Sequence, residues 1–143
     1  MTTSTASAVW EGGLKTGKGS FNAGSGAFHG AYSFSTRFEG AKGTNPEELI
    51  AAAHAACLSM ALSAGLEKAG TPATRIATTA SCTIEAGPAG LRITRMKLVV
   101  RGNVPGIDQT KFSKAAEDAK NGCPVSNALK GNVKLELDAL LLE

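Results

Sequence analysis

The sequence predicts an α+β fold in which antiparallel strands pack on two helical segments. Short strands separated by glycine turns fill the first forty-odd residues, and a long apolar helix follows from about residue 46. Alternating strands then flank a second helical segment. A chain of 143 residues can bury a core without disulfides, so we expect one domain over residues 1–143.

The N-terminal third is expected to consist of short strands. Residues 8–10 precede a glycine pair, and Phe21 precedes a glycine-containing loop. From residue 32 to residue 38 aromatic and polar residues alternate, which predicts a further strand with Arg37 on its polar face. The aromatic residues expected to share the opposite face are Tyr32, Phe34 and Phe38.

The strongest helix signal in the chain begins at Asn45. Asn45 is a favourable N-cap, Pro46 suits the first helical position, and two acidic residues complement the positive end of the helix dipole. The helix is expected to extend to about Ala69 and to end at Gly70. Residues 49–66 carry no Asp, Glu, Lys or Arg, but they include seven alanines and three polar residues. We therefore predict a helix buried in a protein core and not a membrane anchor.

The second half of the chain predicts three strands and two short helices. Alternation places apolar residues on one face over residues 76–85, 91–100 and 133–141. A helix capped by Asp108 should end near residue 122, and Cys123 with Pro124 should start another turn of helix.

Charge and cysteine content exclude several classes of function. The net charge is +3 and the basic residues are scattered, so no nucleic-acid partner is expected. No signal-peptide pattern opens the sequence, which favours a cytoplasmic protein whose three cysteines are mostly reduced. No two Cys or His residues have the close paired spacing of a zinc site, so no metal and no cofactor are expected.

The residue pattern alone does not decide which cysteine reacts. Cys123 lies at a helix N-terminus, where backbone N–H groups favour the thiolate, so composition by itself favours Cys123 as the nucleophile. Cys57 lies within an apolar helix, where burial would raise its pKa. Arg37 lies in the aromatic segment just before the long helix, and it is the cation that could favour the thiolate of Cys57.

Other roles for these residues stay open at this point. His54 lies one helical turn before Cys57, so a Cys57/His54 pair could serve a cysteine-dependent hydrolase or acyltransferase. Cys82, on the apolar face of a strand, is interpreted as structural. A noncatalytic stress or binding module, in which the cysteines only pack, is a further alternative.

Several motifs together resemble one known family. They are Phe34-Ser35-Thr36-Arg37-Phe38-Glu39-Gly40, Gly43-Thr44-Asn45-Pro46-Glu47-Glu48-Leu49, His54-Ala55-Ala56-Cys57, Pro105-Gly106-Ile107-Asp108 and Asn121-Gly122-Cys123-Pro124-Val125-Ser126. In this order they resemble the osmotically inducible protein C (OsmC) family, which includes the organic hydroperoxide resistance proteins. The resemblance covers essentially the whole chain, and Arg37 places it in the OsmC branch.

The resemblance implies an intertwined homodimer with strands wrapped around central helices and two active sites near the subunit interface. It implies a thiol peroxidase of oxidative and osmotic stress defence that reduces organic hydroperoxides, with hydrogen peroxide as a second candidate substrate. Cys57 carries over as the peroxidatic cysteine and Cys123 as the resolving cysteine. Arg37 becomes the cation beside the thiolate, and Glu47 its carboxylate partner.

The resemblance also suggests the reactants. A dithiol, with the dihydrolipoyl group of a lipoylated protein as the candidate, is expected to reduce the disulfide between the two cysteines. The alkyl tail of the hydroperoxide would need an apolar pocket. The residues that we expect to line that pocket are Tyr32, Phe34, Phe38, Leu49 and Met60.

Overall fold

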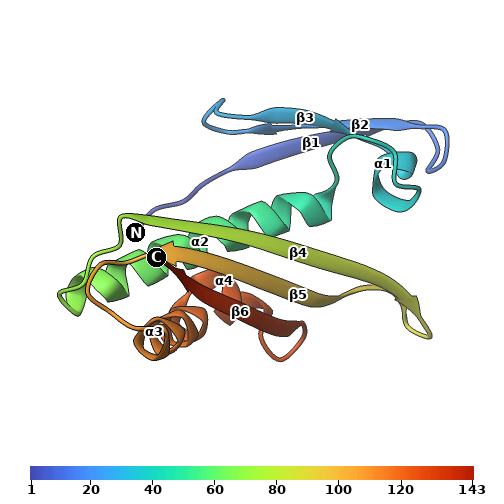
Figure 1. The fold of residues 1–143 in the computed structure, drawn as a ribbon. Coiled ribbons are helices and arrows are strands. Elements are labelled where there is room, and N and C mark those ends of the chain that lie inside the picture. The colour runs from blue at the N-terminus through green and yellow to red at the C-terminus, as the bar shows by residue number, and fades with distance from the viewer. The chain divides into compact units, whose positions relative to one another are not determined.

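The computed structural model describes residues 1–143, and its backbone contacts group them into two compact units, residues 1–49 and residues 50–143. Strands and helices form a mixed α+β fold, as predicted (Figure 1). Helix α2 (Pro46–Lys68) begins in the first unit and continues into the second. A single domain over the whole chain stays a prediction.

The first unit contains an antiparallel sheet of three strands in the order β1-β2-β3. The strands are β1 (Ala6–Glu11), β2 (Lys18–Ala23) and β3 (His29–Tyr32). Gly19 on β2 pairs with Tyr32 on β3, and a Cβ at Gly19 would lie 2.6 Å from the Tyr32 ring. Glycine at this position therefore lets the aromatic ring lie flat across the sheet.

The predicted strand over residues 32–38 is wrong. After Tyr32 the chain turns into helix α1 (Phe34–Phe38), so Arg37 and the phenylalanines lie on a helix and not on opposite faces of a strand. Ser33 is the N-cap: its Oγ accepts from the backbone N–H of Thr36, and the Thr36 hydroxyl accepts from the backbone N–H of Ser33 at 2.9 Å. This reciprocal cap provides acceptors for the backbone N–H groups of Ser33 and Thr36. In a strand these two groups would need acceptors on a neighbouring strand.

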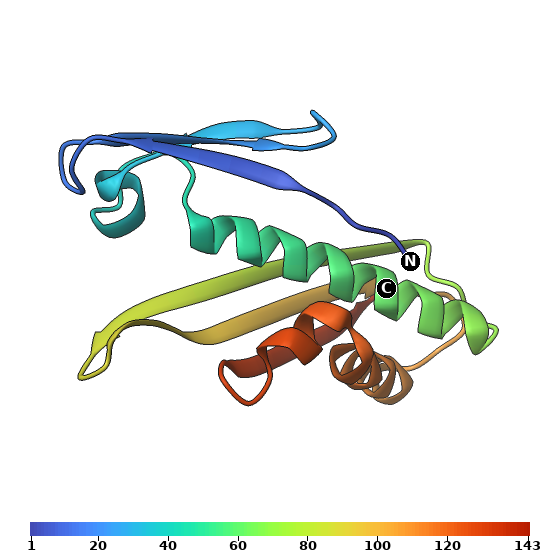
Figure 2. The ribbon, with the colours of Figure 1, turned by 180° about the vertical axis from the view of Figure 1, so that it is seen from behind.

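The second unit contains a three-stranded sheet with helices on one face, as Figure 2 shows from behind. The strands are β4 (Arg75–Gly87), β5 (Gly90–Asn103) and β6 (Lys134–Leu142), and the two further helices are α3 (Gln109–Gly122) and α4 (Pro124–Leu129). Asp108 caps α3 and Cys123 with Pro124 begins α4, as predicted.

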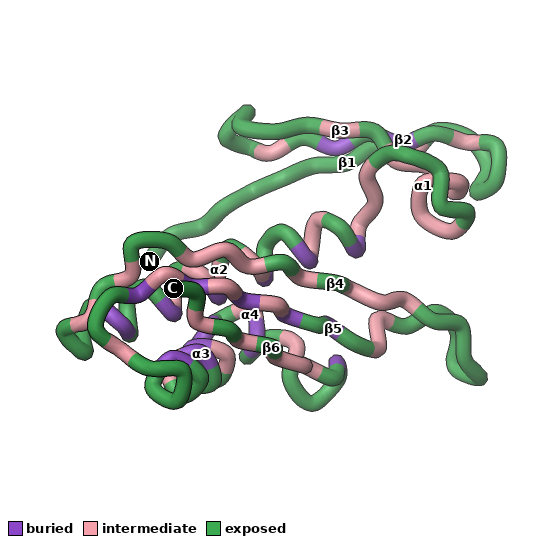
Figure 3. The backbone as a smooth tube through the Cα atoms, viewed as in Figure 1, coloured by how far each residue is buried: buried purple, intermediate pink, exposed green.

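The core of the second unit lies between its sheet and its helices. On β5 the side chains of Met96, Leu98 and Val100 are fully buried, and the residues between them are more exposed, which confirms the predicted alternation. Phe112 of α3 packs against β5 at Gly102, where an added Cβ would lie 2.5 Å from the ring. Buried positions accordingly lie on β5, on α3 and along one face of α2 (Figure 3).

One strand pairing differs from the sequence prediction. β4 and β5 form an antiparallel hairpin, but β6 pairs with β5 in parallel, from Arg95 opposite Lys134 to Asn103 opposite Leu142. A parallel pair needs a crossover, and the segment with α3 and α4 supplies it. Cys123 therefore lies on the crossover between β5 and β6, which covers one face of the sheet.

Helix α2 starts and ends where the sequence predicts. The Oδ1 of Asn45 accepts from the backbone N–H of Glu48 at 2.8 Å, and Gly70 takes a positive φ of 85° just beyond the helix. The helix is long and apolar enough to cross a membrane by length and composition, yet only 28% of its most apolar window is buried. One face of α2 is therefore buried, as predicted for a core helix, and the rest of its surface is more exposed.

Candidate active site

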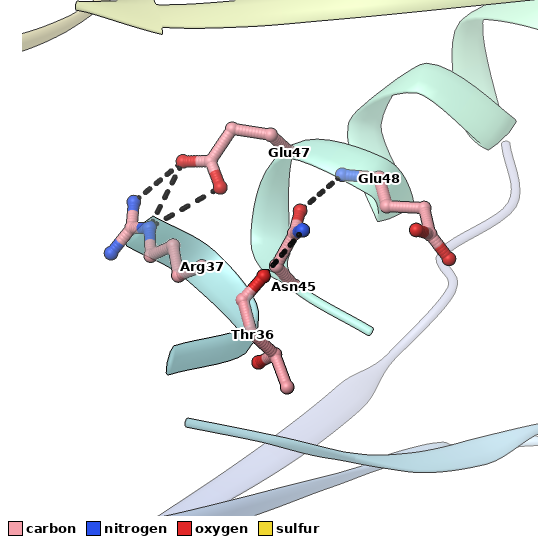
Figure 4. Close-up of polar contacts among 5 residues, drawn as sticks. All are labelled: Thr36, Arg37, Asn45, Glu47 and Glu48. Atoms are coloured by element: carbon pink, nitrogen blue, oxygen red, sulfur yellow. Dashed lines mark hydrogen bonds and ion pairs between the residues drawn. The ribbon is translucent and has the colours of Figure 1, made fainter. Parts of the chain in front are cut away.

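An arginine–glutamate pair forms the polar centre of the first unit (Figure 4). Arg37 Nε donates to both oxygens of Glu47 at 3.1 and 3.2 Å, and Nη2 donates to Oε1 at 2.7 Å. The Glu47 side chain is 7% exposed and that of Arg37 is 35% exposed. The forked contact fixes the plane of the guanidinium and leaves its Nη1 amino group without a partner.

Local chain geometry brings the two charged residues together. The Nδ2 of Asn45 donates to the backbone carbonyl of Thr36 on α1 at 3.3 Å, while its Oδ1 caps α2. One side chain therefore ties the end of α1 to the first turn of α2. Glu47 at that first turn faces Arg37 on α1, ten residues earlier.

The aromatic residues predicted to share one strand face fall into two groups. Tyr32 packs with Trp10 at a centroid distance of 5.5 Å, on the sheet. Phe34 and Phe38 pack on each other at 5.0 Å, one helical turn apart on α1. The guanidinium of Arg37 lies 5.2 Å from the Phe38 ring centroid, in cation–π range. Arg37 therefore contacts Phe38, which in turn packs on Phe34.

The other two predicted lining residues lie on α2. Leu49 is partly buried at the end of the first unit, and Met60 belongs to the second unit and is 75% exposed. No contact in the structure assigns either of them to a pocket for an alkyl tail.

The two cysteines of interest meet in the second unit. Cys57 lies in the middle of α2 and is partly exposed, and Cys123 lies between α3 and α4 and is fully buried. The Cys123 thiol donates a hydrogen bond to the Cys57 sulfur, with the sulfurs 2.8 Å apart across 66 positions of sequence. A small movement would bring them to disulfide bonding distance, about 2.05 Å.

The surroundings affect the two thiols in opposite directions. Burial and the hydrogen bond with Cys123 raise the pKa of Cys57, against a smaller opposing effect of the Val125 backbone N–H. Burial also acts to raise the pKa of Cys123, but the hydrogen bonds with Cys57, with the backbone and side chain of Ser126 and with the backbone of Val125 outweigh it, so the pKa of Cys123 is lowered.

His54 is not paired with Cys57. It is fully buried, and its Nε2 lies 2.7 Å from the hydroxyl of Ser126, while its Nδ1 is buried without a partner. Burial lowers the pKa of His54, which keeps the ring neutral. A Cys57/His54 hydrolase needs a base on Cys57, and this histidine is directed at Ser126 instead.

Ser126 is the residue that sequence analysis missed. It is 1% exposed, and it contacts both His54 and Cys123. The available signal was its position three residues after the N-cap Cys123, where a short side chain can turn back toward the cap. Its other partner, His54, is 72 positions away and could not be identified from spacing.

Two candidates from the sequence are left to consider, the third cysteine, Cys82, and a metal site. Cys82 lies on β4, partly buried against the apolar core, as expected for a structural residue. No group of three or more His, Cys, Asp or Glu residues is placed to hold a metal ion. Two contacting pairs of reactive side chains remain as candidates, one in each unit: Arg37 with Glu47, and Cys57 with Cys123.

Known proteins are similar to this chain in sequence over most of its length. The family model described as OsmC-like protein matches residues 39–138, which include Glu47 and both paired cysteines. Peroxiredoxin OsmC of Escherichia coli (strain K12) is 51% identical over 130 residues, covering 90% of this chain and 91% of that protein. The chain belongs to the OsmC family.

More distant relatives within the family are similar over most of their length. The organic hydroperoxide resistance protein of Xanthomonas axonopodis pv. citri is 35% identical over 100 residues, which cover 68% of each chain. The crystal structure of the organic hydroperoxide resistance protein OhrB of Bacillus subtilis matches with a TM-score of 0.76 at 26% identity, covering 95% of this chain and 98% of that one. An organic hydroperoxide resistance protein of Elizabethkingia anophelis matches with a TM-score of 0.77 at 26% identity, covering 99% of both chains. The OsmC fold thus extends over both units of the chain.

Proposed function

We propose that this protein is a thiol-dependent peroxidase that reduces organic hydroperoxides to alcohols, as the names of its relatives indicate for those proteins. The observation that carries the proposal is the Cys57–Cys123 pair, whose sulfurs lie 2.8 Å apart although 66 positions separate them in sequence. Two thiols in contact beside a partly exposed surface are what a peroxidase needs to form and recycle a disulfide.

The reaction has two steps in this chain. The Cys57 thiolate attacks the outer oxygen of the hydroperoxide, the O–O bond breaks, and the alkoxide takes up a proton to leave as alcohol. Cys57 is then a sulfenic acid. Cys123 attacks its sulfur, the S–S bond forms, the S–O bond breaks, and the hydroxyl leaves as water with the Cys123 proton.

Arg37 and Glu47 are proposed to serve the first step. Cys57 has a raised pKa among the groups of its own unit, so a cation is required to favour its thiolate. Lowering the pKa alone accelerates little, because a more acidic thiol is also a weaker nucleophile. The planar guanidinium, held by Glu47 with its Nη1 group unpaired, is suited to orient the peroxide oxygens and stabilise the charge that develops on them.

The alkyl tail of the substrate is proposed to lie among apolar side chains. Phe34 and Phe38 flank Arg37 on α1, which supports a role for both beside the peroxide group. The remaining members of the proposed pocket are Tyr32, Leu49 and Met60.

A homodimer is proposed as the working form. Small apolar residues and Met60 follow each other at helical spacing along an exposed side of α2, at Ala52, Ala53, Ala56 and Ala64. An apolar stripe of this length on a single chain favours association with a second copy. Sedimentation of Met60→Glu, with Lys68→Glu as the matched control on an exposed position outside the stripe, tests this proposal: only the first should dissociate.

The proposed reductant is a dithiol, such as the dihydrolipoyl group of a lipoylated protein, acting in the cytoplasm during oxidative or osmotic stress. Cys57 is partly exposed and Cys123 is buried, which favours attack by the reductant on the Cys57 side of the disulfide. Rates of recycling with dihydrolipoamide, glutathione and thioredoxin test this point, and dihydrolipoamide should be the fastest.

The deciding experiment separates the two cysteines. Cys57→Ser should abolish the reduction of an alkyl hydroperoxide, because no nucleophile remains. Cys123→Ser should still consume one equivalent of peroxide and then stop. Cys82→Ser is the matched control and should behave as the unmodified protein. Loss of the first oxidation in Cys123→Ser alone would reverse the roles, and no thiol loss after a peroxide pulse would indicate a noncatalytic module.

A further inference from the structure

A continuous line of polar contacts runs from His54 to Cys57 through the interior of the second unit. His54 Nε2 lies 2.7 Å from Ser126 Oγ, Ser126 lies three residues after Cys123 and lowers the pKa of the Cys123 thiol by hydrogen bonding, and the Cys123 sulfur lies 2.8 Å from that of Cys57. His54, Ser126 and Cys123 are each exposed by 1% or less. The peroxidase mechanism above uses only the last two members of this line.

The unpartnered Nδ1 of His54 indicates which ring nitrogen carries the proton, and therefore which group donates in the hydrogen bond with Ser126. A neutral imidazole carries one N–H and one lone pair, and Nδ1 is buried without a partner. A buried N–H without an acceptor is rarer and costlier than a buried acceptor without a donor, so the proton belongs on Nε2. Nε2–H then donates to the Ser126 oxygen, and the Ser126 hydroxyl hydrogen is left to point at Cys123.

We propose that neutral His54 is a positioning residue that fixes the hydroxyl of Ser126 as a donor to the Cys123 sulfur, and that this pair prepares Cys123 for the resolving and recycling steps. The inference rests on the proposed peroxidase function and adds two residues to it. Ser126 touches a reacting atom, whereas His54 acts only through Ser126.

The proposed contact assists Cys123 at two points of the cycle. During resolution, Cys123 attacks the Cys57 sulfenic acid, and the hydrogen bond from Ser126 holds the Cys123 sulfur beside Cys57 while it favours the thiolate. During recycling, a thiolate of the dithiol attacks Cys57, the S–S bond breaks, and Cys123 leaves as a thiolate. The dithiol supplies both electrons and ends as a disulfide, and the same hydroxyl stabilises the leaving sulfur.

The first test needs no variant. Nitrogen-15 NMR of the reduced protein reports the tautomer of His54, and we expect the Nε2–H form. The Nδ1–H form would overturn the proposal, because Ser126 would then donate to His54 and not to Cys123. This result does not depend on any peroxidase activity, so failure of the proposed function and failure of this inference are distinguishable.

The second test compares matched variants in single turnovers. Ser126→Ala should slow the formation of disulfide from the Cys57 sulfenic acid by about tenfold or more, the expected effect of one hydrogen bond to a charged sulfur. Ser126→Thr keeps the hydroxyl and should recover most of that rate. His54→Gln, which can still donate a hydrogen bond to Ser126, should form the disulfide faster than His54→Leu in the same assay.

A third measurement separates positioning from mere packing. In a Cys57→Ser background, carbon-13 NMR at the Cβ of Cys123 should show a higher pKa for this thiol in Ser126→Ala than in Ser126→Thr. Equal Cys123 titrations and equal resolving rates in the alanine and threonine variants would reduce His54 and Ser126 to core residues and contradict the proposal.

Discussion

The two units of the chain hold their reactive pairs in different ways. In the first unit Arg37 and Glu47 are ten positions apart, and the caps of two successive helices bring them together. In the second unit Cys57 and Cys123 are 66 positions apart, and a packed core of helices on a sheet brings them together. The first pair depends on local backbone chemistry and the second on tertiary packing.

The cores of the two units differ accordingly. The buried apolar cluster lies wholly within residues 50–143, whereas Phe21 is the only buried hydrophobic residue of the first unit. Val9, Leu14 and Phe28 of the first unit are more than half exposed. The second unit can therefore stabilise itself by burial, while the first relies on caps, an ion pair and aromatic contacts.

The largest expected effect concerns this difference in burial. Phe112→Ala removes a fully buried ring from the second unit and should lower the free energy of unfolding by about 3–5 kcal/mol, through lost burial and a cavity. Phe28→Ala in the first unit, where the ring is 51% exposed, should cost far less. Urea unfolding at one fixed protein concentration measures both, and equal losses would break the comparison.

Arg37→Lys tests the first unit at the level of chemistry. Lysine keeps the charge but not the planar fork that Glu47 holds, so we expect the second-order rate with an alkyl hydroperoxide to fall by about a hundredfold, or about 2.7 kcal/mol. Glu47→Gln should give an intermediate rate, because it loosens the arginine without removing it. A near-normal rate in Arg37→Lys would reduce Arg37 to a charge that only sets the pKa of Cys57.

Titration of the two thiols tests whether the units act on one another. In Arg37→Gln the groups of the second unit act alone, so Cys123 with its lowered pKa should ionise at lower pH than Cys57 with its raised pKa. A cation favours the thiolate, so the pKa of Cys57 should be lower in the unmodified protein than in this variant. Carbon-13 NMR at the cysteine Cβ atoms follows each thiol. Identical Cys57 titrations would show that Arg37 does not act on Cys57.

The smallest expected effect concerns a helix cap of the first unit. Ser33→Ala removes the hydroxyl that accepts from Thr36 and should cost about 1 kcal/mol in stability. Because α1 carries Arg37, peroxide reduction should also slow modestly. Ser33→Asp, which restores an acceptor at the cap, should recover stability. An unchanged peroxidase rate in Ser33→Ala would show that the Glu47 contact alone holds Arg37.

Sequence reasoning reached most of the fold because the signals were local. Asn45-Pro46, Asp108, Cys123-Pro124 and the alternation on β5 each mark an element boundary or a buried face through chemistry within a few residues. The error at residues 33–38 had a local cause as well: Phe34 and Phe38 are four positions apart, a spacing that places two residues on one face of a strand or of a helix.

The parts that sequence reasoning could not reach depend on contacts distant in sequence. The local sequence does not predict the parallel pairing of β6 with β5, because apolar and polar residues alternate in the same way in parallel and antiparallel strands. The partnership of His54 with Ser126 needs α4 folded against α2. The contact between Cys57 and Cys123 was expected only from the family resemblance, since neither residue pattern nor spacing required it.

The parallel return of β6 has a consequence for biosynthesis. The crossover that holds Cys123 is complete only when residues 134–142, which are synthesised after it, have paired beside β5. A nascent chain therefore displays Cys57 well before its partner thiol is in place. During that interval an oxidant could carry Cys57 beyond the sulfenic stage to the irreversible acids. Rapid completion of the C-terminal strand thus protects the newly made protein as much as it shapes the sheet.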